Sequence, residues 1–180
     1  MIYTYSECIE KYSSDYEIRK MVDNNKLYKL RRGIYSDKKN EPELAIISKM
    51  YPNAVFTLNS AFYYYGLSDS IPSYYYLLTN KDSTKIQDKN IKQFFDNNDS
   101  LKMGLIQIDY NGIKINIFNK ERLLVELIRN KHKLAFDYYK EIIDSYRKII
   151  HQLDIQAIQE YAQSLPKTEL VMKALQMEVF

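Results

Sequence analysis

Residues 14–36 read SDYEIRKMVDNNKLYKLRRGIYS and predict a helix followed by a β-hairpin. The pattern Ser14-x-x-Glu17 is typical of a helix start, because the serine side chain can accept a hydrogen bond from the amide three residues on. Apolar residues then recur at i, i+3 and i+4, which favours an amphipathic helix to about Asn24. The residues of this apolar stripe are Ile18, Met21 and Val22.

The second half of this stretch alternates in the way of two short strands. Residues 27–30 and 34–36 flank Gly33, a residue that turns tightly without steric cost, so they predict a hairpin. Arg31 and Arg32 then lie at its tip. Two cationic side chains at a hairpin tip are suited to contact a phosphate backbone.

A further helix is predicted upstream, where Thr4-x-x-Glu7 repeats the capping pattern and predicts a helix to about Tyr12. Helix, tight turn, helix and basic hairpin together are the order of a winged helix-turn-helix, whose second helix enters the major groove of DNA. Any helical hairpin followed by a β-hairpin would give the same pattern. The candidate DNA-contacting residues are Ser13, Ser14, Tyr16, Arg19, Lys20, Lys29, Arg31 and Arg32.

The charge distribution along the 180 residues supports this interpretation. The net charge is only +3, but residues 19–39 carry eight basic and two acidic side chains, a local net of +6. The rest of the chain is therefore slightly acidic, at about −3. A basic patch on a near-neutral body is typical of a phosphate-binding module. A solvated lysine-rich surface would look the same, so charge alone leaves both interpretations open.

The remainder of the chain predicts an α+β body with a small antiparallel sheet and a helical C-terminal third. The clearest signal is a hairpin of residues 105–109 and 113–117, which alternate cleanly on either side of Tyr110-Asn-Gly112. Strands are also predicted at 74–79 and about 91–95, with an extended link at 53–57. Helices are predicted at 41–50, 58–65, 120–129, 136–150, 154–165 and 167–177. We therefore predict two domains, residues 1–38 and 39–180.

Nothing in the sequence predicts catalysis, a metal site or a cofactor. His132 and His151 have no acidic or cysteine neighbours at ligand spacing, and no glycine-rich phosphate loop is present. A nuclease-like carboxylate pair could be drawn from Asp109 and Glu121, but a hairpin turn and a helix start explain them equally well. The single Cys8 excludes a disulfide framework.

No apolar run approaches 18 residues and no secretory signal is evident, so the expected location is the cytoplasm, with no membrane partner. Charges of alternating sign follow one another from Glu121 to Arg129 at i+3 and i+4 spacings. This spacing favours a ladder of ion pairs on the surface of the 120–129 helix.

Four stretches occur in the order and spacing of a known family: LYKLRRGIY at 27–35, YPNAV at 51–55, SAFYYYGL at 60–67 with Ile71-Pro72, and ERLLVELIR at 121–129. On these motifs the chain resembles the AbiEi-type antitoxins of type IV toxin–antitoxin systems, which act in abortive infection and phage defence. The resemblance covers about residues 4–165.

The resemblance implies a winged helix-turn-helix that binds inverted repeats in its own promoter and represses the operon. It also implies a C-terminal domain that neutralises a nucleotidyltransferase-like toxin without a stable complex. By position, the recognition helix is Ser14–Asn24 and the wing tip is Arg31 to Gly33. The signature S-A-L-x-x-H-G-L maps onto residues 60–67 with Phe62 and Tyr65 as departures, and E-R-T-L-V-D maps onto residues 121–126 with Leu123 and Glu126 as departures.

These observations predict a non-enzymatic, DNA-binding antitoxin and autorepressor. Its partners would be double-stranded DNA and the toxin, with a monomer or weak dimer placing two copies on one operator. Three alternatives remain: a protein-interaction module, an orphan transcriptional regulator without antitoxin activity, and an enzyme that uses carboxylates such as Asp109 and Glu121.

Overall fold

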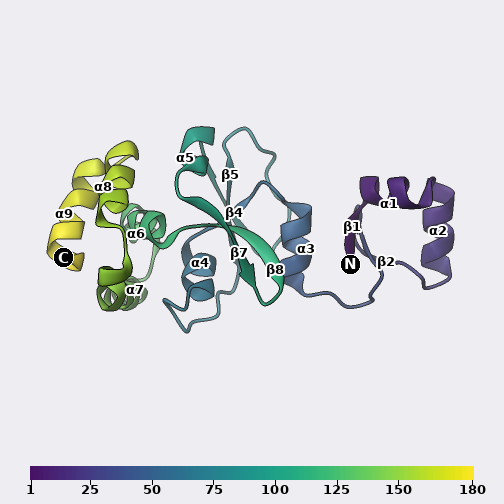
Figure 1. Cartoon of the computed structure of the whole chain (residues 1–180), viewed down its shortest axis with the longest axis horizontal. Helices are drawn as coiled ribbons and strands as arrows, with labels where there is room; N and C mark the ends of the chain where they lie inside the picture. Colours follow the sequence, from purple (N-terminus) through teal and green to yellow (C-terminus); the bar gives the residue numbers. More distant parts are fainter. The chain divides into compact units, whose positions relative to one another are not determined.

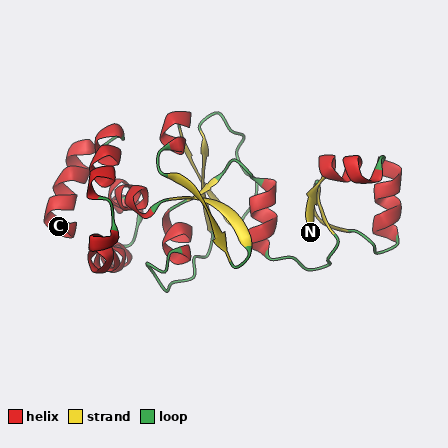
Figure 2. Cartoon of the chain, in the orientation of Figure 1, coloured by secondary structure: helices red, strands yellow, loops and turns green.

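The computed structural model describes all residues 1–180, and they form an α+β protein with nine α-helices and two sheets (Figures 1 and 2). The chain divides into two compact units. Unit 1 comprises residues 1–53 and 109–114, and unit 2 comprises residues 54–108 and 115–180. Unit 1 continues beyond residue 38 because helix α3 (Glu43–Met50) packs on its strands. The independent domain of residues 1–38 stays a prediction.

Unit 1 carries a three-stranded antiparallel sheet in the order β1-β3-β2. Its two predicted helices and the predicted hairpin are present. Strand β1 was not predicted, because three residues are too few to show an alternating pattern. In chain order the elements are β1 (Ile2–Thr4), α1 (Tyr5–Tyr12), α2 (Asp15–Asp23), β2 (Tyr28–Arg31) and β3 (Ile34–Ser36).

Helix α1 begins with a complete capping box. The Glu7 amide donates to the Thr4 hydroxyl at 3.3 Å, and the Thr4 amide donates to the Glu7 carboxylate at 2.7 Å. The same carboxylate lies 2.6 Å from the ammonium of Lys49 on α3. These contacts, chiefly the one with Lys49, lower the pKa of Glu7. The sequence pattern that predicted the helix therefore also ties its start to α3.

Removing this cap should weaken α1 measurably. We expect Thr4→Ala to destabilise unit 1 by about 1 kcal/mol, since it leaves the Glu7 amide without its partner. The measurement is amide hydrogen exchange along α1 together with the unfolding midpoint. Ser6→Ala, two residues further on at an exposed position, is the control and should change stability by less than about 0.5 kcal/mol. Equal effects of the two variants would contradict the capping role.

The core of unit 1 is small and centres on one cysteine. Cys8 of α1, Ile18 of α2, Leu27 and Tyr35 of β3 are buried together, and Cys8 is wholly inaccessible to solvent. Burial raises the pKa of the Cys8 thiol. The two helices and the hairpin therefore each contribute a residue to the same buried cluster.

Unit 2 contains a five-stranded sheet in the order β6-β5-β4-β8-β7. The prediction of a small antiparallel sheet is wrong here, because β4 pairs in parallel with β8 and β5 in parallel with β6. The predicted extended link at 53–57 supplies the central strand β4. The strands are β4 (Val55–Phe56), β5 (Tyr75–Asn80), β6 (Ile91–Asp96), β7 (Leu105–Tyr110) and β8 (Ile113–Phe118).

The helices of unit 2 pack around α6, whose residues 122–128 are all buried. Such a helix is enclosed on every side. It contacts α4, α8 and α9 (Figure 1). The bounds are α4 (Leu58–Tyr64), α5 (Asn98–Lys102), α6 (Lys120–Arg129), α7 (Phe136–Ile149), α8 (Ile155–Ser164) and α9 (Thr168–Ala174), with short helical turns at Lys131–Lys133, Ile150–Gln152 and Leu175–Val179.

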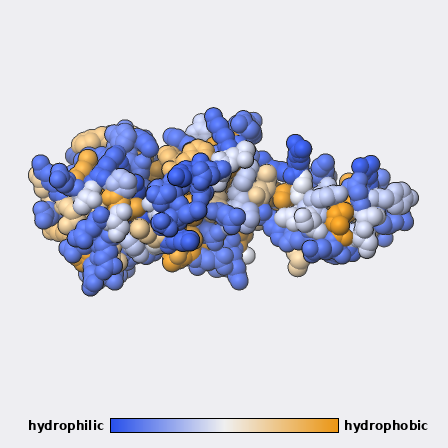
Figure 3. Space-filling view, turned by 90° about the horizontal axis from the view of Figure 1, so that it is seen from above, coloured by the Kyte–Doolittle hydropathy of each residue, from blue (hydrophilic) through white to orange (hydrophobic).

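Helix α5 falls in a segment predicted to be turn-rich, where the Asn97 side chain accepts from the Ser100 amide at 2.8 Å and so caps five residues of helix. None of the helices has the combination of length and hydrophobicity that crossing a membrane requires. The face of the molecule in Figure 3 is largely hydrophilic, and the hydrophobic residues on it form small separate patches.

Candidate nucleic-acid interface

The α1–α2 turn places the predicted polar residues at the start of α2. Ser13 adopts a left-handed conformation (φ 68°) that ends α1. Ser14 accepts a hydrogen bond from the Glu17 amide at 3.2 Å, so its hydroxyl is occupied as a helix cap. Tyr16, the one aromatic residue of the predicted site, is 72% exposed. The turn therefore leaves Tyr16 available and uses Ser14 structurally.

The two basic residues of α2 are paired with acids on the same helix. Arg19 contacts Asp15 at 2.7 Å and Lys20 contacts Glu17 at 3.7 Å. All four side chains are well exposed, and exposed pairs of this kind contribute little stability. Both cations can therefore turn toward a phosphate, but Asp15 and Glu17 place negative charge at the start of the helix.

The β2–β3 hairpin presents its cations differently. Lys29 and Arg32 are exposed and form no ion pair, whereas Arg31 is half-buried and bonded to Glu43 of α3. The pairing of β2 with β3 shifts register between Lys29 and Arg31, which is an irregularity that twists a hairpin. Arg31 thus joins the hairpin to α3, and its role in DNA contact stays a prediction.

Three exposed lysines near this hairpin were counted in the basic segment but not included among the predicted site residues. Lys26 precedes β2, and Lys38 and Lys39 follow β3; all three are exposed and form no ion pair. With Lys29 and Arg32 they make five unpaired cations, which we call the hairpin cation set. Exposed like charges without partners favour an anionic surface as ligand. A count of neighbouring acids in the sequence does not separate them from Arg19 and Lys20, because Asp23, Asp37 and Glu41 lie within four residues of these lysines.

The stretch that maps onto the first signature, residues 60–67, lies in unit 2 with Ser60 to Phe62 and Leu67 buried and residues 63–65 half-buried. The Ser60 hydroxyl accepts from the Tyr76 amide at 2.9 Å and donates to the Tyr74 carbonyl at 3.4 Å, so it ties α4 to β5. The Tyr65 hydroxyl donates to the Phe118 carbonyl at 2.9 Å. Burial raises the pKa of Tyr65 to about 12. These residues join α4 to two strands of the sheet.

The second signature, residues 121–126, lies in the core, so the predicted surface ladder of ion pairs is wrong. The Arg122 side chain is 0% exposed and that of Glu126 is 8% exposed. Arg122 donates to Glu126 Oε1 from Nε at 3.1 Å and from Nη2 at 2.7 Å. Identical i, i+4 spacing suits a surface or an interior, and here Asp96 and Ser100 from other elements cover the face of α6 that carries the charges.

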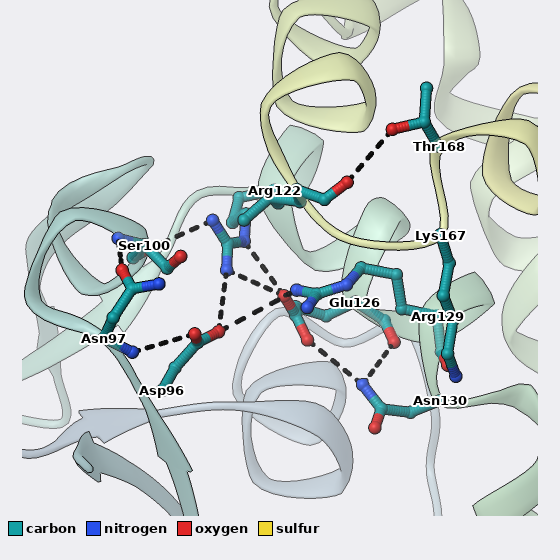
Figure 4. A network of polar contacts seen from close by, with 10 residues as sticks. Asp96, Asn97, Ser100, Arg122, Glu126, Arg129, Asn130, Lys167 and Thr168 are labelled. Atoms are coloured by element: carbon teal, nitrogen blue, oxygen red, sulfur yellow. Dashed lines mark hydrogen bonds and ion pairs between the residues drawn. The ribbon is translucent and has the colours of Figure 1, made fainter.

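Residues from outside α6 complete this buried network (Figure 4). Arg122 Nη1 donates to the Ser100 carbonyl at 3.1 Å, and Asp96 Oδ2 lies 4.0 Å from Nη2. Arg129 donates a hydrogen bond to Glu126 Oε1, and the side-chain amide of Asn130 donates to Glu126 Oε2 at 3.0 Å. Burial is the main cause that lowers the pKa of Arg122, opposed by the nearby Glu126 carboxylate. The network satisfies both oxygens of Glu126.

Each of the two carboxylates considered for catalysis is engaged in a local hydrogen bond. Asp109 accepts from the Gly112 amide at 2.7 Å in the hairpin turn, and Glu121 accepts from the Asp154 amide at 3.2 Å. No three His, Cys, Asp or Glu side chains gather where they could hold a metal ion. Comparison with protein-family models gives no match, and comparison with curated proteins gives no significant relative.

Proposed function

We propose that the chain is a DNA-binding antitoxin of the AbiEi type, which represses its own operon through inverted repeats and neutralises a nucleotidyltransferase-like toxin. The observation that carries the DNA-binding half is the arrangement of unit 1. The order β1-α1-α2-β2-β3, with the strands arranged β1-β3-β2, supports the assignment of a winged helix-turn-helix. In this assignment α2 is the recognition helix and the β2–β3 hairpin is the wing.

The charges support the wing as the main phosphate contact. The hairpin cation set has no acidic partners, whereas Arg19 and Lys20 must first leave Asp15 and Glu17. Phosphate contacts position a protein on DNA, and base contacts from the recognition helix read the sequence. We therefore assign positioning to the wing and sequence reading to the exposed face of α2 that carries Tyr16 and Arg19.

The antitoxin half rests on the resemblance of the unit 2 signatures. Both signatures hold buried polar contacts: Ser60 and Tyr65 join α4 to the sheet, and Arg122 with Glu126 joins α6 to β6 and α5. Residues that hold a scaffold in this way support a non-enzymatic body. No stable complex with the toxin is required, and two monomers or a weak dimer would occupy one operator.

The wing assignment predicts a specific loss of binding. Lys29→Ala with Arg32→Ala should weaken binding to the DNA upstream of the chain's own gene by about tenfold or more, because two phosphate contacts are lost. The slope of log K against log salt concentration should also fall by about 2. Fluorescence anisotropy with labelled upstream DNA at three salt concentrations measures both quantities.

Lys85→Ala with Lys89→Ala is the matched control. It removes the same charge from exposed lysines in the loop between β5 and β6 of unit 2. Arg19→Ala with Tyr16→Ala should instead reduce the preference for upstream DNA over a scrambled duplex. If the control pair weakens binding as much as the wing pair, binding is non-specific and the winged-helix assignment fails.

The antitoxin activity is tested in cells. Cells that express the neighbouring toxin gene should grow again when this chain is co-expressed. The wing variant, Lys29→Ala with Arg32→Ala, should also restore growth but should no longer repress the operon. Rescue that requires a complex stable to purification would favour a protein-interaction module. Repression without any rescue would favour an orphan regulator.

A further inference from the structure

A pocket of about 390 Å³ opens beside the buried network of α6, entirely within unit 2. Its volume lies in the range of about 300–1,000 Å³ that is typical of small-molecule sites. Its lining combines two kinds of residue. The apolar ones are Leu58, Leu78, Phe94 and Phe95, and the polar or charged ones include Thr57, Asp96, Glu126, Arg129, Asn130 and Lys133. A ligand with both apolar and polar groups would match this lining.

The two carboxylates that line the pocket, those of Glu126 and Asp96, already accept hydrogen bonds from neighbouring residues. Glu126 accepts from Arg122 and Arg129 on Oε1 and from Asn130 on Oε2. Asp96 Oδ1 accepts from the Asn97 amide at 2.9 Å, and Oδ2 lies 3.9–4.0 Å from the guanidinium groups of Arg122 and Arg129. The carboxylates therefore have little capacity left for a cationic or donor ligand.

Hydrogen-bond donors, in contrast, are in surplus. The Arg129 side chain is only 13% exposed and uses one hydrogen bond, to Glu126, of the five that a guanidinium can donate. Lys133 forms no ion pair or hydrogen bond through its ammonium, which lies 5.4 Å from the centre of the Phe94 ring. Three cations (Arg122, Arg129, Lys133) face two carboxylates, so one negative charge would neutralise the site.

Thr57 adds a further donor to the pocket. The residue is 2% exposed and lines the pocket, and its hydroxyl makes no hydrogen bond, not even the cap of α4 that it precedes. The fully buried side-chain atoms without a partner are Asn59 Oδ1 and the Tyr138 hydroxyl, so the Thr57 hydroxyl is open to the pocket. It can therefore donate to a ligand there.

The backbone beside Thr57 is strained. Leu58 has φ 44°, a left-handed conformation that is rare for a bulky residue, and its side chain is buried against the pocket. Strained residues persist where the surroundings hold them, and they gather at ligand sites. The strain, the unpartnered hydroxyl and the surplus donors all occur at one cavity.

We propose that this pocket binds a small organic anion, a carboxylate or a phosphate monoester. Its oxyanion group accepts hydrogen bonds from Arg129, Lys133 and the Thr57 hydroxyl. Its planar or apolar body lies against Leu58 and against Phe95, which is 47% exposed. This site is separate from the candidate nucleic-acid interface, and its test does not depend on DNA binding or antitoxin activity.

Three probes of similar size test the charge preference by isothermal titration calorimetry: benzoate, phenyl phosphate and the cation benzamidine. Benzoate or phenyl phosphate should bind with a Kd of about 1 mM or tighter. The tighter of the two identifies the carboxylate or the phosphate monoester as the ligand class. Benzamidine binding as tightly as both anions, or no anion binding up to about 10 mM, would overturn the proposal.

Two variants locate the binding. Lys133→Gln should weaken the better anion about tenfold, because it removes a charge-assisted contact. Lys173→Gln, at an exposed lysine of α9, is the matched control and should leave the Kd unchanged. If the two variants have equal effects, the anion binds by general surface charge and the pocket is misassigned.

Thr57→Val separates a ligand role from a structural one, since it removes the hydroxyl and keeps the branched shape. We expect anion binding to weaken about fivefold while the melting temperature of the probe-free protein stays the same, because the hydroxyl caps no helix and makes no hydrogen bond within the protein. A lower melting temperature with unchanged binding would show that the hydroxyl is structural and would remove Thr57 from the site.

Discussion

Glu126→Ala should destabilise unit 2 by about 3–5 kcal/mol, the range measured when one partner of a buried ion pair is removed. Arg122 would keep its charge with a 0% exposed side chain, and its Nε and one Nη2 donor would lose their acceptor. Arg129 would lose its hydrogen bond at the same time. Since domains are stable by about 5–15 kcal/mol, this loss approaches unfolding. Urea denaturation followed by circular dichroism measures it.

Two further variants show whether the charge or the cavity causes the loss. Arg122→Met combined with Glu126→Leu should be more stable than Glu126→Ala by at least about 1 kcal/mol, because no buried charge is left unpaired. Glu160→Ala, at an exposed position of α8, should change stability by less than about 0.5 kcal/mol. A double variant less stable than Glu126→Ala would mean that the ion pair itself stabilises the core.

Gly104→Ala should cost about 3 kcal/mol, combining about 1–2 kcal/mol of backbone strain with about 1–3 kcal/mol of overpacking. Gly104 has φ +69°, and an added Cβ would lie 2.6 Å from Arg122 Cβ and 2.8 Å from Asn119 Oδ1. That Asn119 oxygen caps α6 by accepting from the Arg122 amide at 2.9 Å. The new methyl group would therefore displace the start of the helix that carries the network.

Gly112→Ala is the matched control, because its φ of +80° imposes the same strain but no atom lies within 4 Å of the added Cβ. We expect it to cost about 1 kcal/mol. The difference between the two variants in chemical denaturation isolates the close approach of Gly104 to α6. Equal costs would mean that the α6 start can move aside.

Local features of the fold could be predicted from the sequence. The caps at Thr4 and Ser14 and the hairpin across Asn111-Gly112 depend on residues within four positions of one another, so each stretch carries its own signal. Pairing between distant strands carries no such signal. The parallel alignment of β5 with β6 and the two-residue strand β4 in the centre of the sheet were therefore missed.

The candidate sites show the same difference between residues close in the chain and residues far apart in it. The basic hairpin was predictable because its cations are consecutive in the chain. The burial of Arg122 was not, since its partners Asp96 and Ser100 come from β6 and α5, more than 20 residues away. The pattern of α6 gave no warning, because its apolar residues follow the amphipathic periodicity that a surface helix also shows. The pocket at Thr57 depends on four separate segments of the chain and could not be predicted.

The buried Cys8 has a practical consequence. It is the chain's single cysteine, it lies at the centre of the unit 1 core, and its raised pKa keeps the thiol protonated and unreactive while the core is closed. A thiol reagent therefore modifies the protein at a rate set by the opening of unit 1, with no contribution from unit 2. The rate of Cys8 modification therefore reports the opening of unit 1 alone, and DNA that holds unit 1 closed would lower that rate.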